Sequence, residues 1–385
     1  MDKRVYLFTA ISFIVGMVEL IIGGILDLIA TDLQISLSKT GLLISIFSLT
    51  FAIAAPILLV ATSHIERKKL ALISLVVFLI GNIIAITSTS FTLLMLSRII
   101  SAASGSLLTV LCITIASNIV KREYVGRAIG LVVMGISGSI VLGVPIGLLI
   151  SNAFGWRATF IFIAVLTFFL IIISFFAMEK IKPAPSIPLK AQLATLKNNK
   201  ILFAHLTMFL FLAGGTTLYA YFTPFLKTTM SLSPTMVSVV YFIYGIAAIS
   251  GGGIGGTLTD RYGSRPIMLT VITCFALAML TIPYTIFSLP VFLLVVIIWG
   301  MLSWTITPTI QSYLIEAAPE TAAIQQSLCN SALHFGIAFG SFIGGFVIDQ
   351  SSVVHNASIG GLIVLIALAT AVYSITRKTM LAKQA

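Results

Sequence analysis

The chain has 385 residues, of which 59% are hydrophobic and 9% are charged, and its formal net charge at pH 7 is +11. Soluble chains carry about 25% charged residues, so this composition excludes a soluble domain and indicates a polytopic membrane protein. The positive charge does not indicate a nucleic-acid partner, because the basic residues lie in short segments between apolar runs. We find no plausible catalytic set and no phosphate-binding glycine loop, so we expect neither an enzyme nor a bound cofactor or metal ion.

The chain contains twelve apolar runs, and each is about 20 residues long or longer, which is enough to cross a bilayer as a helix. The first run follows a basic N-terminal segment but has no small-residue cleavage site, so we expect an uncleaved first span. The predicted fold class is therefore an all-α membrane protein with twelve transmembrane helices. The predicted spans are 5–30, 40–62, 69–89, 92–119, 126–151, 157–178, 201–226, 234–258, 266–287, 290–312, 322–349 and 356–376.

The basic residues predict how these spans are oriented. With the N-terminus in the cytoplasm, eighteen Lys and Arg residues fall in cytoplasmic segments, and three, Lys39, Arg157 and Lys227, fall on the outer side. Because cytoplasmic loops carry the excess of Lys and Arg, this asymmetry predicts a multi-pass membrane protein whose N-terminus is cytoplasmic. Both termini are then cytoplasmic.

The longest polar segment, residues 179–200, divides the chain into two halves. It begins with three prolines and becomes a basic amphipathic stretch. We interpret it as a cytoplasmic linker between an N-terminal six-helix bundle, 1–178, and a C-terminal six-helix bundle, 201–385.

The fifth span of each half has small residues at four-residue spacing, which form a smooth face for close helix packing. This echo predicts a parallel six-span repeat, an arrangement that builds transporters with a site near the membrane midplane. The small residues are Gly135, Ser139, Gly143 and Gly147 in the first half, and Gly336, Gly340 and Gly344 in the second.

Two acids, Glu19 and Asp27, lie in the first span, and Arg98 lies in the fourth. A carboxylate inside a span costs at least about 2.5–3.5 kcal/mol, so two of them need a reason. Eight residues of helix rotate by about 80° and rise by about 12 Å, so both acids can face one cavity at two depths. One interpretation is a structural partner for a buried arginine, and the other is a proton-titrating site in a transporter. We expect Arg98 to pair with Asp27, which lies at a similar depth.

The loop after the eighth span, GGTLTDRYGSRP, resembles the loop motif of the major facilitator superfamily. In such a motif the acid ends a helix at the inner surface, nearby arginines can pair with it, and a glycine permits the tight turn. The resemblance implies a latch that holds one access state of the transporter. The matching loop of the first half, ATSHIERKKL, departs from the pattern, since Ser63 stands where the acid is expected and Glu66 where the glycine is. The motif residues are Gly256, Asp260, Arg261, Gly263 and Arg265.

The fifth span contains LGVPIG, with Gly143, Pro145 and Gly147, and this stretch resembles the exporter-associated motif of the same superfamily. Pro145 removes one backbone hydrogen bond and the glycines allow close approach, so the helix can bend. The stretch SRIISAASGSL around Arg98 resembles the buried-arginine motif of the fourth span.

These motifs together resemble the twelve-span drug:proton antiporters of the superfamily over the whole chain. The resemblance implies the major facilitator fold, with two six-helix bundles around a central cavity, and secondary active export driven by inward proton flow. It implies a monomer whose partners are protons, a small-molecule substrate and the lipid bilayer. The proton-coupling residues would be Glu19, Asp27 and Arg98.

Several stretches resemble bacterial purine efflux pumps more closely, among them VELIIGGILDLIATDL, HIERKKL, LYAYFTPFL and WGMLSWTITPTIQSYLIEAAPE. This resemblance implies export of purine bases or nucleosides across the bacterial inner or plasma membrane. A flat heteroaromatic base needs an aromatic face to stack on and polar groups for its edge, and we expect these from Tyr219, Trp304, Asn330 and His334. The alternative is a broad-specificity multidrug:proton antiporter of the same fold.

Overall fold

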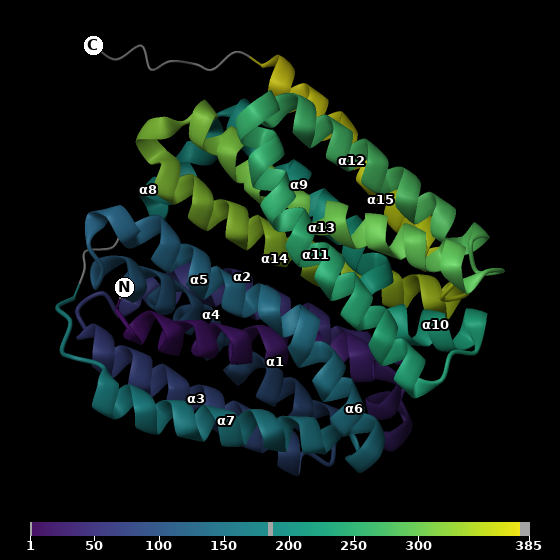
Figure 1. Cartoon of the computed structure of the whole chain (residues 1–385), viewed down its shortest axis with the longest axis horizontal. Helices are drawn as coiled ribbons and strands as arrows, with labels where there is room; N and C mark the ends of the chain where they lie inside the picture. The colour runs from purple at the N-terminus through teal and green to yellow at the C-terminus, as the bar shows by residue number, and fades with distance from the viewer. Residues whose placement is uncertain (1, 184–187, 378–385) are drawn as a thin grey trace. The chain divides into compact units, whose positions relative to one another are not determined.

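The computed structural model describes residues 2–183 and 188–377. Pro185 of the expected linker, and Lys378 and Lys383 of the expected cytoplasmic C-terminus, lie outside the described residues. The described chain is all-helical, and twelve of its helical segments are long and apolar enough to cross a membrane (Figure 1). This confirms the prediction of an all-α protein with twelve spans.

The first six spans lie close to their predicted positions. They are α1 (Arg4–Asp32), α2 (Leu37–Ala61), α3 (Arg67–Thr87), α4 (Phe91–Asn118), a fifth span made of α5 (Val125–Gly138), η2 (Ser139–Gly143) and α6 (Val144–Phe154), and α7 (Trp156–Ala177).

The other six spans follow a short helix, α8 (Leu189–Ala194), in the second part of the predicted linker. They are α9 (Asn199–Tyr219), α11 (Pro234–Tyr262), α12 (Ser264–Thr281), α13 (Leu289–Ala317), α14 (Ala322–Gln350) and α15 (His355–Thr376).

The predicted seventh span, 201–226, is not one continuous helix. It breaks after Tyr219, and a separate short helix, α10 (Phe222–Met230), follows. The break has a local cause, because Pro224 has no N–H to donate to the carbonyl of Ala220 four residues earlier. The hydroxyl of Tyr221 at the break donates a hydrogen bond to the carbonyl oxygen of Ser341, at 3.0 Å.

The contacts divide the chain into two compact units. Unit 1 comprises Met1–Ser186 and Phe222–Gly245, and unit 2 comprises Ile187–Tyr221 and Ile246–Ala385. Helix α10 and the first part of α11 therefore pack with unit 1, although they follow the linker in the chain. The division into bundles 1–178 and 201–385 stays a prediction.

The small residues of the fifth span pack against the first span within unit 1. A Cβ atom added to Gly143 would lie 3.2 Å from the side chain of Met17 in α1, and one on Gly135 would overlap the carbonyl oxygen of Thr9. In unit 2 a Cβ atom on Gly340 of α14 would likewise overlap the backbone of α9. The same face therefore packs on the first span of each half, as expected for a repeated six-span unit.

The exporter-like stretch contains a local widening of its helix. Residues Ser139–Gly143 form a π-helical turn, and Pro145 follows in the first turn of α6. A proline ring collides with the carbonyl four residues earlier, here that of Val141, so a wider turn relieves the collision. The predicted bend at Pro145 thus takes the form of a π turn between α5 and α6.

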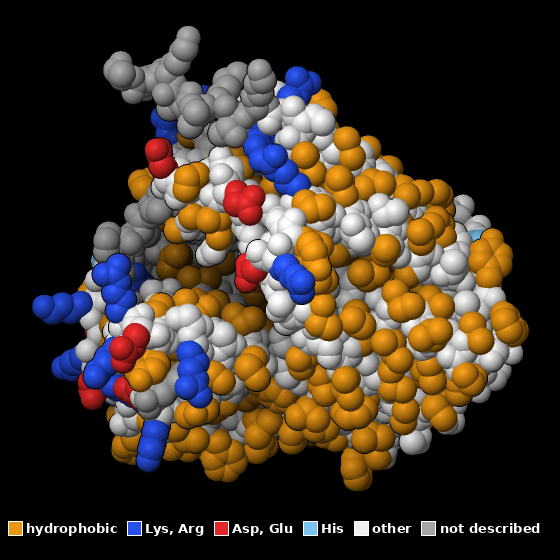
Figure 2. Space-filling model, turned by 45° about the horizontal axis from the view of Figure 1, so that its top comes forward, with side chains coloured by type: hydrophobic (Ala, Val, Ile, Leu, Met, Phe, Trp, Pro, Cys, Tyr) orange, Lys and Arg blue, Asp and Glu red, His pale blue; other side chains and the backbone are white. Residues whose placement is uncertain are grey.

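Large apolar side chains cover wide areas of the surface seen in Figure 2. On α7, Phe168, Phe169 and Phe176 are more than half exposed, as are Phe342 and Phe346 on α14. In water such surfaces would be an aggregation liability, whereas lipid tails solvate them. The surface agrees with a multi-pass membrane protein.

Candidate functional site

The buried cation of unit 1, Arg98 on α4, lies between α1 and α2. The residue is 1% exposed, and its Nη1 donates a hydrogen bond to the backbone carbonyl oxygen of Val18 at 2.9 Å. The guanidinium carbon lies 4.1 Å from the ring centre of Phe47 on α2, within cation–π distance. The carboxylate that acts electrostatically on Arg98 is Glu19, the residue after Val18.

Two of the three guanidinium nitrogens of Arg98 make no hydrogen bond to the described residues. Within the described part of the chain, Nε and Nη2 of Arg98 are buried and make no hydrogen bond. These two donors form one edge of the planar guanidinium, an edge whose geometry suits a carboxylate. Glu19, which is partly exposed and interacts electrostatically with Arg98, is the candidate carboxylate for this edge.

The structure pairs Asp27 with Lys227 instead of Arg98. Asp27 Oδ2 lies 2.5 Å from Nζ of Lys227, and the two side chains are 23% and 29% exposed. The expected Asp27–Arg98 pair is therefore not formed. The physical reason is the position of α10, which places a lysine beside the last turns of α1, where its charge neutralises Asp27.

Thr223 fixes α10 by one contact with α1 and one with α11. The hydroxyl of Thr223 donates to the carbonyl oxygen of Gly24 at 3.0 Å and lies 3.2 Å from the hydroxyl of Tyr241 on α11. Sequence analysis counted Lys227 only as an outer-side basic residue. An acid near the end of one span and a lysine near the end of another could have suggested the pair, but not which of several candidates forms it.

The end of α1 is tied to the turn between α6 and α7 by the residues that follow the exporter-like stretch. Asp32 Oδ2 accepts hydrogen bonds from Trp156 Nε1 at 3.1 Å and from Arg157 Nη1 at 2.7 Å. Arg157 also donates to the carbonyl oxygen of Ser88 at 2.7 Å. The third acid of α1 is thus part of a structural network.

The four residues expected to bind substrate all belong to unit 2. Tyr219 on α9 lies 6.2 Å from Trp299 on α13, measured between ring centres, in a tilted arrangement. Trp304 on α13 and Asn330 on α14 are partly exposed, whereas His334, one turn after Asn330, is buried. The structure thus provides an aromatic pair around Tyr219, and the grouping of all four residues at one site stays a prediction.

The loop that matches the superfamily motif joins α11 to α12. Gly263 has a positive φ of 87° and precedes the first residue of α12, so the chain turns there in a conformation that favours glycine. Ser264 then donates a hydrogen bond to Oε2 of Glu316 on α13 at 2.8 Å. Asp260 is exposed, as are Arg261 and Arg265, and within the described residues Asp260 makes no ion pair. The expected pairing of Asp260 with a nearby arginine is therefore absent from this conformation.

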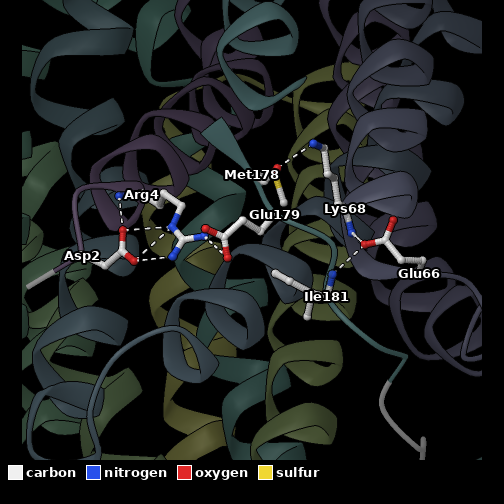
Figure 3. A network of polar contacts seen from close by, with 7 residues as sticks. All are labelled: Asp2, Arg4, Glu66, Lys68, Met178, Glu179 and Ile181. Atoms are coloured by element: carbon white, nitrogen blue, oxygen red, sulfur yellow. Dashed lines mark hydrogen bonds and ion pairs between the residues drawn. The ribbon is translucent and has the colours of Figure 1, made fainter. Parts of the chain in front are cut away.

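The corresponding loop of unit 1 holds the beginning of the linker (Figure 3). Glu66 Oε1 accepts a hydrogen bond from the backbone N–H of Ile181 at 2.8 Å, and the N–H of Arg67 donates to the carbonyl oxygen of Ile181 at 3.0 Å. Lys68 Nζ donates to the carbonyl oxygen of Met178 at 2.6 Å. Burial raises the pKa of Glu66, but hydrogen bonds from backbone N–H groups and the charge of Lys68 outweigh it and hold that pKa below its ordinary value.

The N-terminal segment holds the same stretch from the other side. Arg4 pairs with Asp2 at 2.6 Å and with Glu179 at 3.4 Å, as Figure 3 shows. Residues 178–181 are therefore fastened to unit 1 by side chains from two separate segments.

Twelve apolar helices, a repeated packing of glycines on the first span of each half, and an acid and a base that interact within the spans define a polytopic membrane transporter. The family description of the Major Facilitator Superfamily matches residues 8–341. The chain belongs to this superfamily.

The similar proteins are transporters too. The chain is 33% identical, over 95% of its length and 94% of the relative, to an uncharacterized MFS-type transporter, YbcL, of Bacillus subtilis strain 168. It is 26% identical to the inner membrane transport protein YdhP of Escherichia coli K12, over 88% of its length and 87% of the relative. It is 24% identical to a probable sugar efflux transporter of Helicobacter pylori strain G27, over 95% of its length and 93% of the relative.

Solved structures show the same fold. A bacterial homologue of the human lysosomal transporter Spinster, in an inward-facing and unoccupied conformation, matches 97% of this chain and 96% of its own with a TM-score of 0.75 at 14% identity. The human organic anion transporter MFSD10 matches 96% of this chain and 100% of its own with a TM-score of 0.71 at 15% identity. The major facilitator fold expected from the motifs is confirmed.

Proposed function

We propose that this transporter is a proton-coupled antiporter that exports purine bases or nucleosides. The observation that carries the proposal is the Glu19–Arg98 pair, in which a buried arginine has two unused donors beside an ionisable carboxylate. A carboxylate inside a membrane is expensive when charged and unpaired, so it favours either a proton or a full ion pair. These two alternatives are the states that a coupling site requires.

The exchange follows from the chemistry of the pair. In this conformation Arg98 donates to the Val18 carbonyl and lies over the Phe47 ring, and we assign this arrangement to the state with a proton on Glu19. When Glu19 releases its proton to the cytoplasm, the carboxylate binds the Nε and Nη2 edge of Arg98. That movement shifts α1 against α4, and we propose that this shift couples proton release to the change of access. Both termini are cytoplasmic in this proposal, as the distribution of Lys and Arg predicts.

The purine assignment is supported by the aromatic and polar residues of unit 2. Tyr219 and Trp304 provide faces for stacking, and Asn330 and His334 provide donors and acceptors for the edge of a base. The resemblance to purine efflux pumps points the same way. A broad-specificity multidrug:proton antiporter remains the second candidate, because a second acid, Asp27, lies in α1 and could bind an organic cation.

The test is substrate-dependent proton flux in proteoliposomes that contain the purified full chain. We expect hypoxanthine, guanine or their nucleosides to drive proton movement, and Glu19→Gln to abolish accumulation against a gradient while leaving the protein folded. The matched control is Glu123→Gln, which neutralises an exposed acid in the short helical turn before α5 and should transport like the wild type.

Two outcomes would contradict the proposal. If the Glu19→Gln protein still concentrates substrate against a gradient, Glu19 does not carry the coupling proton. If nucleobases and nucleosides drive no flux and lipophilic cations do, the multidrug alternative replaces the purine assignment.

A further inference from the structure

Lys227 is the positively charged partner of the second acid in α1, and no family motif or expected site includes it. We infer that Lys227 determines specificity: it is a cation belonging to the protein that occupies Asp27 and so excludes organic cations from this carboxylate. The inference rests on the proposed export function and narrows its substrate class to uncharged molecules such as nucleobases.

The pair is held by ordered neighbours and is not a loose surface contact. The ammonium group lies 2.5 Å from Oδ2 of Asp27, and both side chains are about three-quarters buried. Helix α10 is anchored one turn earlier by Thr223, which donates to the carbonyl oxygen of Gly24 in α1. Phe222 and Phe225 of α10 are fully buried, and the Phe222 ring packs edge-on against Tyr241. The lysine is therefore presented to Asp27 by a rigid segment.

The charge balance along α1 leaves no carboxylate for a cationic substrate in this conformation. Asp27 is neutralised by Lys227, and Glu19 lies in the field of Arg98. An organic cation that approached Asp27 would meet the ammonium group and be repelled, since like charges side by side are strongly unfavourable where water is scarce. A neutral base meets no such penalty.

Removal of the lysine charge should open this carboxylate. Asp27 Oδ1 is buried and makes no hydrogen bond with any described residue. Without the ammonium group on Oδ2, both oxygens of the carboxylate could therefore interact with a cation. A carboxylate that is partly shielded from water and interacts with Tyr241 of α11 is a suitable site for a lipophilic cation.

The experiment measures binding of tetraphenylphosphonium to the purified full chain by equilibrium titration, alongside hypoxanthine transport. We expect weak binding by the wild type and by Lys227→Arg, which keeps the charge. Lys227→Gln and Lys227→Met should bind the cation about tenfold more tightly or better. The gain should disappear in the double variant Lys227→Gln, Asp27→Asn, because the carboxylate is then lost.

A purely structural role for Lys227 predicts a different pattern. In that case Lys227→Gln and Lys227→Met would lower the melting temperature but leave the affinity for the cation unchanged. This result would overturn the inference. A gain that persists in the double variant would also overturn it, because Asp27 would not be the binding group. Tight, Asp27-dependent binding by the wild type would show that Lys227 excludes nothing.

One measurement does not depend on how well the Lys227 variants fold. If Lys227 already occupies the carboxylate, Asp27→Asn alone leaves the weak cation affinity of the wild type unchanged, and a fall in affinity would overturn the inference. Absence of purine transport by the wild type would count against the proposed function, whereas the cation titrations decide the role of Lys227 separately.

Discussion

The loop between α2 and α3 and the turn between α11 and α12 occupy the same place in the two six-span repeats, yet they have different contacts. The first departs from the superfamily motif, and its Glu66 accepts hydrogen bonds from the N–H groups of Lys68, Lys69 and Ile181. It therefore caps α3 and holds the linker together. The second matches the motif, yet its Asp260 and Arg261 are exposed.

A match to the motif therefore does not indicate how many contacts a loop makes with the rest of the protein in one conformation. A glycine in place of Glu66 would have no side chain to cap α3 or to hold Ile181. The acid that replaces it gives the α2–α3 loop a fixed role in unit 1. The residues of the second loop match the motif in type, and their contacts are the turn at Gly263, the Ser264–Glu316 bond and the approach of Arg261 to the ring of its neighbour Tyr262. We therefore expect substitutions in the first loop to act on the resting structure, and those at Asp260 to act on the change of access.

The largest effect on stability should come from the turn residue of the second loop. Gly263 has φ 87° and ψ 155°, a region that side chains other than glycine rarely adopt. Gly263→Ala should therefore destabilise the protein by about 1–3 kcal/mol. Thermal unfolding in detergent measures this, with Gly256→Ala as the matched control.

The control replaces a glycine that lies within a helix instead of a turn. Gly256 lies inside α11, and a Cβ atom there meets no other atom within 4 Å. An alanine at that position should be neutral or should stabilise the helix by up to about 1 kcal/mol. Equal destabilisation by both alanines would show that the turn conformation is not the cause.

The next largest effect should follow from loss of the Glu66 side chain. Glu66→Ala removes the cap of α3 and the bond to Ile181, and a lost cap costs about 0.5–2 kcal/mol. Residues 178–181 should become more mobile, which a spin label at Lys180 would report as a narrower spectrum. Glu123→Ala is the control, since Glu123 is exposed and caps no spanning helix. An unchanged spectrum in Glu66→Ala would mean that other contacts hold the linker.

Sequence patterns predicted the spans because length and hydropathy alone decide whether a segment can cross a bilayer. They also identified Glu19 and Arg98 as candidate functional residues, since ionisable groups inside spans are rare. They paired Asp27 wrongly, because equal depth along two helices does not say which side chains face each other. The break before α10, which brings Lys227 to Asp27, comes from Pro224 within an otherwise continuous apolar run. The bonds that hold Ile181 and Met178 use backbone atoms, which leave no trace in the sequence.

The charge of Glu66 should make a smaller, pH-dependent contribution. Its pKa in the folded protein is lowered from the ordinary value of 4.5, so its charge stabilises the fold above that value. The contribution is lost as the pH falls through the lowered pKa. Glu66→Gln keeps one acceptor but no charge, so its melting temperature should lie below that of the wild type at pH 7, and the gap should close in acid. A gap that widened below the ordinary pKa would contradict the assignment of the charged form.

The smallest effect on stability should come from Asp260→Asn. Asp260 is exposed and makes no ion pair within the described residues, so the change should alter the free energy of unfolding by no more than about 0.5 kcal/mol. Its role as a latch would then belong to the other access state, where nearby arginines can reach it. We expect Asp260→Asn to shift the access equilibrium more than it changes substrate affinity, because it can act only through the movement between states.

Cysteine labelling from the outer side of the membrane, combined with substrate titration, measures the two quantities separately. A large loss of affinity with unchanged labelling would contradict the latch. A large loss of stability would show that Asp260 is already bound in the resting conformation, and the contrast between the two loops would disappear. Arg261→Gln should reproduce the shift in labelling, because an ion pair formed in only one access state depends equally on both of its members.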